Sequence, residues 1–375
     1  MFKSYRWFYK DKNFINEIDK IKLIKFFNTS FDYQLGWEPL ANSQKIESFG
    51  NGKKGLLKFD ELKRRSDPNR KLAFSDYAIF GDSFALSRQV NENETIAYFL
   101  GKSLKKYIPN YGVGNYGIDQ AYLRYKKYKK KLEKKHIIYI VVPESIVRIN
   151  TRWRHLHETG NTFGFKPKFE INNLQNITLL KNPIRNFSDY ENIFNSFKEG
   201  KSELIDDPMF KLRFKEEAFN LSNLLGLRSA TFYKLLELIE WRIKKNFLES
   251  ISDKNGLTIR MKSNSRFTNK CYSNLETNRL FTKLILEINS VHKNKMSIFL
   301  IPQLSDFKIN NYKREKYFEN LRNNYNIKIF DATKFLIKEI GTKNNAESLY
   351  VEKGYGGHLN KNGNYLVANW IRSLI

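Results

Sequence analysis

The sequence predicts an α/β protein: a three-layer α/β/α sandwich around a mostly parallel sheet, with a helical insertion. The segment "HIIYIVVPES" (136–145) is apolar, rich in β-branched residues and ended by proline, which is typical of a buried strand. Other short apolar runs alternate with amphipathic helical patterns, as expected for parallel strands joined by crossover helices. This alternation stops near residue 150 and resumes near residue 276.

The first half of the chain supplies two predicted strands and three predicted helices. Apolar positions at helical spacing indicate a helix in "FINEIDKIKLIKFF" (14–27), and "FDYQLGWEPLANS" (31–43) is predicted to be an ordered loop. "DYAIFGDSF" (76–84) predicts a strand that precedes the 136–145 strand. Amphipathic helices are expected in "ENETIAYFLGKSLKKY" (92–107) and in the strongly basic "DQAYLRYKKYKKKLEKK" (119–135).

The second half begins with an interruption and then returns to strands and helices. An aromatic- and Arg-bearing loop is followed by mostly helical patterns, of which "ATFYKLLELIEWRIKKNFLESI" is an example. The later elements are a helix in 278–295, strands in 296–303 and 326–332, and a closing helix in 360–375.

This order divides the chain into four parts. Residues 1–70 are expected to be lead-in helices and a loop packed on the core, and 71–150 the first half of the α/β domain. Residues 151–275 are expected to be the loop and helical insertion, and 276–375 the second half of the α/β domain.

The composition is strongly basic and rich in aromatic residues. The 375 residues include 66 Lys and Arg against 39 Asp and Glu, a formal net charge of +27. The excess is mostly Lys scattered from end to end, whereas nucleic-acid interfaces typically cluster Arg with interleaved aromatics. Solvated lysines are therefore the favoured interpretation, and an acidic partner is the alternative.

Neither a disulfide framework nor a membrane-spanning segment is indicated. Cys271 is the single cysteine of the sequence, so no disulfide forms within the chain. "MFKSYRWFYKDKNF" carries charges every few residues, unlike a secretory signal, and no window approaches ~18 uninterrupted apolar residues. We therefore expect a soluble, cytoplasmic protein.

Ser83 follows a predicted strand in "YAIFGDSFAL" (77–86). Parallel strands open their carboxyl ends at the ligand-binding edge of a sheet, and a helix that begins there aims free N–H groups at that edge. Gly81 relieves crowding beside a sharp turn that holds the hydroxyl outward. Ser83 is therefore a candidate nucleophile, and the alternative is an ordinary helix N-cap.

A serine nucleophile needs a base, and the sequence offers five histidines. His358 lies in the glycine-rich "EKGYGGHLNKNGN", just before the last predicted helix, and is either a site residue or a surface residue. His136 and His292 stand beside basic residues near element ends, which favours surface positions. His155 and His157 form only a weak metal-binding pattern, and we expect no metal ion and no cofactor.

The glycines of "NYGVGNYG" (110–117) let backbone N–H groups approach a ligand closely. Such N–H groups suit an oxyanion hole, in which donors are aimed at developing negative charge. The alternative for this segment is a plain turn.

Taken together, three stretches resemble the SGNH family of GDSL-type hydrolases. "IFGDSF" matches the first block of the family, and "NYGVGNYGIDQAYLRY" is similar to the second, commonly N-x-G-V-x-G-Y-G-x-D-Q in bacterial members. "GGHLNKNGNYLVANWI" resembles the last block. The likeness covers residues 60–90, 108–150 and roughly 295–375, in the order and spacing of the family.

The resemblance implies a flavodoxin-like fold and acyl chemistry. Ser83 would attack an acyl carbonyl, and His358 would take its proton and later deliver it. The backbone N–H groups of Ser83, Gly114 and Asn115 would stabilise the oxyanion.

The sequence departs from the family pattern at three places. Tyr355 stands where the family has an Asp three residues before its His, so Glu352 or a backbone carbonyl is left to orient the imidazole. Asn115 replaces the usual Gly of the oxyanion turn, and Asn tolerates a positive φ. "VVPESIVRI" replaces an Asn-Asp pair, so Glu144 or Arg148 occupies the place of an oxyanion-side Asn. We interpret these changes as a divergent subgroup rather than a degenerate site.

The segment "RINTRWRHLH" follows the central predicted strand and supplies candidate substrate contacts. Stacking on tryptophan and bidentate hydrogen bonds from arginine suit sugars and anionic groups. The candidates are Glu144, Arg148, Arg152, Trp153 and His155. A folded loop with Trp153 buried is the alternative.

We therefore expect a serine-dependent ester hydrolase or O-acyltransferase acting on an O-acyl group, such as an O-acetyl group, of a carbohydrate or similar small molecule or glycan. Nucleic acid is not an obligatory partner in this hypothesis. The alternative is a non-catalytic SGNH-like module that binds an anionic polymer or nucleic acid.

Overall fold

The computed structural model describes residues 19–48, 52–132, 135–158, 161–198, 202, 204, 207, 265, 267–293, 295–352 and 356–375. The chain forms two compact units, a first unit of Met1–Glu38 with Asn150–Ser263 and a second unit of Pro39–Ile149 with Asn264–Ile375. The expected lead-in of 1–70 is thus divided between the units after Glu38. The helix predicted at 230–251 lies outside the described residues.

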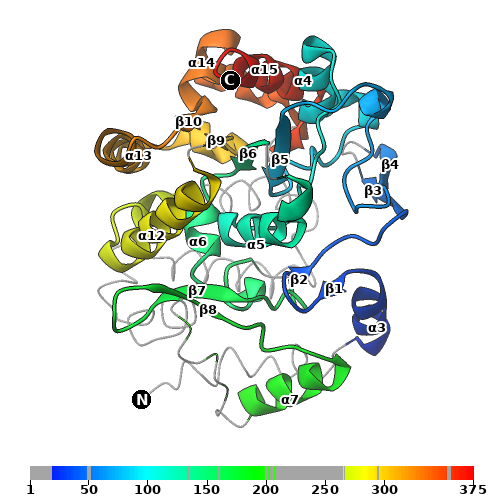
Figure 1. Ribbon diagram of the computed structural model, residues 1–375, viewed down its shortest axis with the longest axis vertical. Coiled ribbons are helices and arrows are strands. Elements are labelled where there is room, and N and C mark those ends of the chain that lie inside the picture. Colours follow the sequence, from blue (N-terminus) through cyan, green and yellow to red (C-terminus); the bar gives the residue numbers. More distant parts are fainter. Residues whose placement is uncertain are drawn as a thin grey trace, which may run out of the picture. The chain divides into compact units, whose positions relative to one another are not determined.

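A four-stranded, all-parallel sheet forms the centre of the second unit (Figure 1). Its strands are β5 (Tyr77–Gly81), β6 (His136–Val141), β9 (Met296–Leu300) and β10 (Ile329–Asp331), in the order β10-β9-β6-β5. All four coincide with predicted strands, so the α/β class and the parallel pairing are confirmed. Apart from His136 and Ser297, the adjacent central strands β6 and β9 are apolar, because both of their faces are covered.

A further segment, residues 107–113, runs along the edge of β5 that faces away from β6. It forms a parallel bridge between Ile79 and Asn110. Tyr111 donates its N–H to the Ile79 carbonyl at 2.7 Å, and Val113 donates to the Gly81 carbonyl at 3.1 Å. These bonds bring the glycine-punctuated loop to the carboxyl end of β5.

One face of the sheet packs against three helices: α4 (Ile96–Leu104), α14 (Ala332–Ile340) and α15 (Lys361–Arg372). Ile79 and Ile138 contribute to this core from neighbouring strands. The apolar stripes predicted for the 92–107 and 360–375 segments are thereby confirmed as buried faces.

Aromatic residues cover the opposite face, because side chains alternate along a strand. Phe80 of β5 stacks on Tyr111 with ring centroids 4.7 Å apart, and it meets Tyr125 of α5 (Ile118–Tyr128) edge-on. Tyr139 of β6 shares a hydrogen bond of 3.1 Å with His292 of α12 (Leu275–His292).

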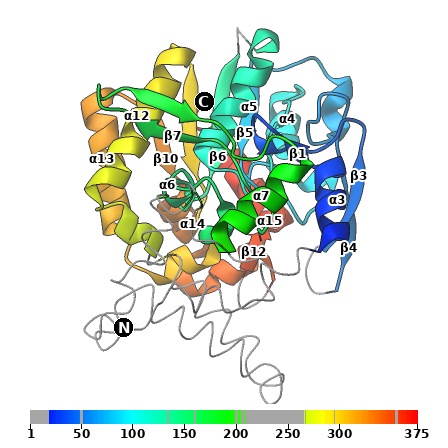
Figure 2. The same cartoon turned by 90° about the horizontal axis from the view of Figure 1, so that it is seen from below.

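The second unit is completed by short strands, helices and turns. Helix α12 lies beside α13 (Tyr312–Tyr325; Figures 1 and 2), and Thr282 of α12 shares a hydrogen bond of 2.7 Å with Tyr317 of α13. The remaining elements are β3 (Gln44–Ser48), β4 (Lys54–Lys58), η1 (Pro68–Lys71), η2 (Glu92–Glu94), η3 (Lys129–Lys131), α6 (Ser145–Arg148), η7 (Leu304–Lys308), α13 (Tyr312–Tyr325), η8 (Lys343–Leu349), β11 (Tyr350–Glu352) and β12 (Gly356–Leu359).

The first unit is held together by aromatic contacts between its two chain segments. Phe26 of α3 (Lys20–Thr29) packs on Phe163 at 5.9 Å, and Phe27 meets Phe187 of α7 (Phe187–Lys198) at 5.7 Å between ring centroids. Its elements are α3 (Lys20–Thr29), β1 (Phe31–Asp32), β2 (Gly36–Trp37), η4 (Arg154–Leu156), β7 (Lys168–Ile171), β8 (Ile177–Leu180) and α7 (Phe187–Lys198). The antiparallel β7–β8 hairpin lies in a region predicted to be loop and helix, and β1 and β2 replace an expected loop.

Within the described ranges, no helix combines the length and the apolar character needed to cross a lipid bilayer.

Candidate active site

The carboxyl end of β5 forms a sharp elbow that carries Ser83. Gly81 has a φ of +145°, and a Cβ built on it would lie 1.8 Å from the Ile140 carbonyl oxygen. Only glycine fits there, as the sequence predicted. Ser83 itself is 5 % exposed.

Asp82 fixes this elbow to the neighbouring strand. Its carboxylate is fully buried and accepts the N–H of Phe84 at 2.8 Å and the N–H of Val142 at 2.7 Å. Burial raises the pKa of Asp82, whereas Arg148 and these two N–H groups oppose that shift. Asp82 therefore holds the Ser83 turn at the ends of β5 and β6.

No α-helix begins at Ser83, which corrects the expectation of a strand-to-helix turn. Residues 82–90 form successive turns, and α4 starts only at Ile96 with Thr95 as its N-cap. Ser87 and Gln89 have φ values of +51° and +68°, which interrupt any right-handed helix. The N-cap interpretation of Ser83 and the expected helix dipole at this edge are therefore both wrong.

The 110–117 segment packs directly on these turns. Asn110 donates its side-chain N–H to the Ala85 carbonyl at 2.7 Å, and a Cβ on Gly112 would lie 2.4 Å from the Leu86 nitrogen. Asn115 has a φ of +65°, the left-handed conformation that asparagine tolerates. A Cβ on Gly114 would meet nothing within 4 Å, so the turn borders open space.

His358 reaches the elbow from the far end of the sequence. It lies on β12, in a hairpin with β11, although the sequence predicted a loop. Its ring is 5.1 Å from the ring of Phe84, the residue after Ser83. Among the described residues, no hydrogen bond joins Ser83 to His358; the Ser83 carbonyl accepts the N–H of Arg88 at 3.1 Å.

Gln89 is the direct partner of His358, and sequence reasoning missed it. Its Oε1 lies 2.5 Å from Nδ1 of His358 and accepts the backbone N–H of His358 at 3.1 Å. Gln89 Nε2 donates to Glu352 Oε1 at 3.4 Å. Glu352, which the sequence offers beside a backbone carbonyl as a group that could orient the imidazole, contacts Gln89. Tyr355 lies outside the described residues.

The surroundings of His358 disfavour its protonated form. Loss of hydration is the main cause and Arg88 the next, and together with Arg148 they lower the pKa of His358 to about 3, against an opposing effect of Glu47. Arg88 is itself paired with Glu47 at 2.8 Å. The imidazole is therefore neutral at pH 7 and available as a proton acceptor.

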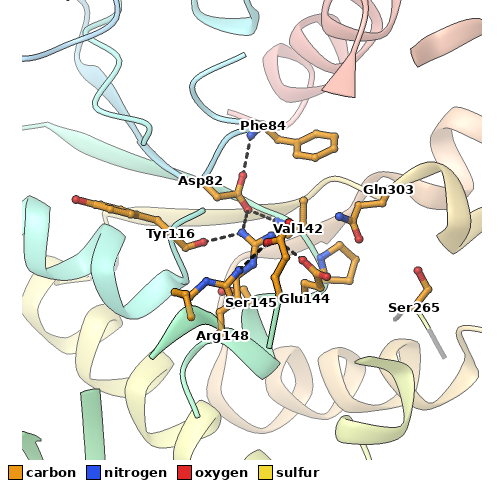
Figure 3. Close-up of polar contacts among 12 residues, drawn as sticks. Asp82, Phe84, Tyr116, Val142, Glu144, Ser145, Arg148, Ser265 and Gln303 are labelled. Atoms are coloured by element: carbon orange, nitrogen blue, oxygen red, sulfur yellow. Dashed lines mark hydrogen bonds and ion pairs between the residues drawn. The ribbon is translucent and has the colours of Figure 1, made fainter. Parts of the chain in front are cut away.

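Glu144 and Arg148 form a buried clamp beneath the elbow (Figure 3). Arg148 donates to Glu144 at 2.6 Å and to the Tyr116 carbonyl at 2.8 Å, and its Nη1 lies 3.5 Å from the Asp82 carboxylate. The Arg148 side chain is 4 % exposed. Held by these acceptors, Arg148 stabilises the ends of β5 and β6 and the 110–117 turn.

The other predicted substrate contacts belong to the first unit and are engaged in its core. Trp153 is 1 % exposed, stacks on Phe165 at 5.2 Å and donates Nε1–H to the Thr162 carbonyl at 2.9 Å. His155 is buried against the Trp153 ring, and Arg152 donates to the Lys181 carbonyl at 2.7 Å. The ring of Trp153 has no open face for a sugar, so the buried-loop alternative holds.

The remaining histidines are mostly interior residues. His292 is buried with its ring 4.0 Å from that of Tyr125, and His136 is half-buried with Nε2 3.0 Å from Ser297 Oγ. The expectation that both lie at the surface is therefore wrong. His157 is buried, and no group of three or more His, Cys, Asp or Glu in the described part of the chain is arranged to hold a metal ion.

Compared with known proteins, the sequence matches no family model and no curated protein.

Proposed function

We propose that this chain is a serine-dependent ester hydrolase or O-acyltransferase that forms an acyl-enzyme on Ser83. One observation supports the proposal: the ring of His358 packs on the ring of Phe84, the residue that follows Ser83, although 275 positions separate Ser83 from His358 in the sequence. Nucleophilic acyl transfer requires a serine that a neutral imidazole can reach, and the contact with Phe84 brings the His358 ring to the residue next to Ser83, at the carboxyl end of parallel strands.

The fold proposed with this function is a three-layer α/β/α sandwich of the SGNH type. Helices pack against side chains from both faces of the sheet. If residues 107–113 are included as an edge strand, the spatial order is 2-1-3-4-5, the flavodoxin-like order. The three sequence blocks that resemble SGNH hydrolases support the same assignment.

The proposed reaction proceeds in two steps. Ser83 Oγ attacks the ester carbonyl carbon while its proton passes to His358, and the tetrahedral oxyanion accepts hydrogen bonds from backbone N–H groups of Ser83, Gly114 and Asn115. The ester C–O bond then breaks, and the leaving alcohol takes the proton from His358. Water or a second hydroxyl then attacks the acyl carbonyl carbon while its proton passes to His358. The bond between the acyl group and Ser83 Oγ breaks, and Ser83 takes the proton back from His358. Ser83 must approach His358 when substrate binds, a tightening that is common on forming the enzyme–substrate complex.

The proposed substrate is an O-acyl group, such as O-acetyl, on a carbohydrate or similar molecule. Trp153 takes no part in recognition because it is buried. The cation that acts most strongly on His358 is Arg88, which is 39 % exposed and already paired with Glu47 at 2.8 Å, so it gives no reason to require a charged sugar.

A non-catalytic binding module is the second candidate, and one surface favours it. Five exposed lysines gather on α5 and η3: Lys126, Lys127, Lys129, Lys130 and Lys131. Binding of an anionic polymer that weakens steeply with salt, in a protein without esterase activity, would favour this candidate.

Release of p-nitrophenol from p-nitrophenyl acetate tests the enzyme proposal. We expect Ser83→Ala to lower the rate by roughly 10³-fold or more, towards that of buffer. Ser103→Ala, at a serine of α4 that only bonds the Leu100 carbonyl, should leave the rate unchanged. Full activity in purified Ser83→Ala would remove Ser83 from the mechanism. Acetate release from acetylated and deacetylated glycans then tests the substrate class.

A further inference from the structure

The hydrogen bonds of Gln89 determine which ring nitrogen of His358 carries the proton. The backbone N–H of His358 can only donate, so the Gln89 atom 3.1 Å away from it must be the carbonyl oxygen Oε1. The same oxygen lies 2.5 Å from Nδ1. Because an amide oxygen only accepts, Nδ1 is the protonated nitrogen and Nε2 keeps the lone pair.

The other end of the Gln89 amide agrees with this orientation. Its Nε2 faces the Glu352 carboxylate at 3.4 Å, and a carboxylate accepts hydrogen bonds from an amide N–H. Glu352 and His358 lie on the paired strands β11 and β12. One hairpin thus offers Gln89 both an acceptor and two donors.

Two unusual backbone conformations make this contact fit. Gln89 has a φ of +68°, a left-handed conformation that is unfavourable for a residue with a Cβ. Gly357 has a φ of +65°, and a Cβ there would lie 2.9 Å from Gln89 Oε1. Such outliers persist where their surroundings fix them and often cluster at functional sites.

We propose that Gln89 is the positioning residue of the Ser83–His358 pair, holding the imidazole as the Nδ1–H tautomer, and that Glu352 holds the Gln89 amide rather than the imidazole. The catalytic meaning of this assignment rests on the proposed function. A neutral amide thereby takes the place that a carboxylate occupies in a Ser-His-Asp triad. It fixes the ring and the tautomer but supplies no negative charge to the imidazolium.

Nitrogen-15 NMR of histidine-labelled protein tests the tautomer without any assay of activity. The His358 signals are identified by their absence from His358→Gln. We expect Nδ1 to be protonated and Nε2 unprotonated at pH 7 in the unaltered protein, and a mixture of tautomers in Gln89→Leu. Gln175→Leu is the matched control, because Gln175 also has a φ of +65° but lies in the β7–β8 turn. An unprotonated Nδ1 in the unaltered protein would overturn the proposal, whether or not the chain is an esterase.

Kinetics separate positioning from simple structural support. We expect Gln89→Leu to lower kcat by about 10²-fold or more with little change in KM, since loss of the correct tautomer costs up to roughly 10⁴-fold in a serine triad. Glu352→Gln, which leaves the amide contact to His358 in place, should cost less than tenfold. Equal losses in both variants would contradict the assigned order of contacts.

Gln89→Glu keeps the proposal testable if Gln89→Leu fails to fold. A carboxylate beside Nδ1 should raise the His358 midpoint in the NMR titration by one pH unit or more, against the unchanged effects of Arg88, Arg148, Glu47 and Glu352. No shift would show that residue 89 does not contact the imidazole. The expected tautomer and shift in a chain without esterase activity would support Gln89 as the partner of His358 and reject the proposed function alone.

Discussion

At the scale of single residues, the elbow depends on Gly81, which has no side chain, and on the buried carboxylate of Asp82. Gly81 passes the Ile140 carbonyl so closely that no Cβ fits between them. Asp82 then ties the turn to β6 through the N–H of Val142. Gly81 and Asp82 thus determine the position of Ser83, which explains why the three residues of "GDS" occur together.

Gly81→Ala should therefore destabilise the second unit far more than a glycine substitution without a clash. Gly341 is the control, because its φ is +78° and a Cβ there meets nothing within 4 Å. We expect about 1 kcal/mol for Gly341→Ala from the left-handed conformation alone. For Gly81→Ala we expect about 3 kcal/mol or more, because backbone must move as well. Hydrogen exchange of the β5 and β6 amides in urea measures both, and equal values would contradict the close approach.

At the scale of elements, the junction between the β11–β12 hairpin and α15 positions His358. Asn360 caps α15 by accepting the N–H of Gly363 at 3.0 Å. Its side-chain N–H groups donate to the carbonyls of Ser348 at 2.7 Å and Tyr350 at 3.1 Å. Asn360, which lies two residues after the candidate base His358, thus joins α15 to the start of β11.

Asn360→Ala should consequently affect the site as well as the helix. We expect a loss of roughly 2 kcal/mol in stability, from the cap and the two carbonyls left unpaired, and a lower kcat. Asn274→Ala is the matched control, since Asn274 caps α12 by accepting the N–H of Thr277 at 2.9 Å. It should cost about 1 kcal/mol and leave kcat unchanged. Identical kcat values in the two variants would argue against a positioning role of this junction.

At the scale of the whole molecule, burial disfavours the charged forms of several titratable groups in a protein of large positive net charge. Burial lowers the pKa of His292 to about 4, and His358 behaves similarly. Asp306 acts in the opposite direction, because burial raises its pKa to about 6 despite the nearby Arg314. Folding therefore responds to pH between 4 and 6.5 through groups of opposite sign.

His292→Gln isolates one of these groups. The unfolded chain binds a proton at His292 below about pH 6.5, whereas the folded protein does so only near pH 4. The contribution of His292 to the free energy of unfolding is therefore full above pH 6.5. It decreases as the pH falls, by up to about 1.4 kcal/mol per pH unit. Urea unfolding from pH 4 to 8 should show that extra loss in the unaltered protein relative to His292→Gln. Parallel curves over the whole range would contradict the neutral, buried state.

The sequence by itself determined the parallel strands, their helices, the glycine-dependent elbow at Ser83 and the left-handed turn at Asn115. These features follow from local patterns, because apolar periodicity and backbone sterics act over a few residues. It also singled out His358, through its glycine-rich surroundings and the family resemblance.

Only the tertiary structure decided which partners those residues have. Gln89 approaches His358 because two left-handed residues, Gln89 itself and Gly357, meet across the chain, and no local pattern announces such a meeting. For Trp153 the sequence left open a sugar contact or a buried loop, and the structure places the ring in a core, since burial depends on what packs around a ring. Long-range packing and hydrogen bonding, which one-dimensional spacing does not encode, settled both.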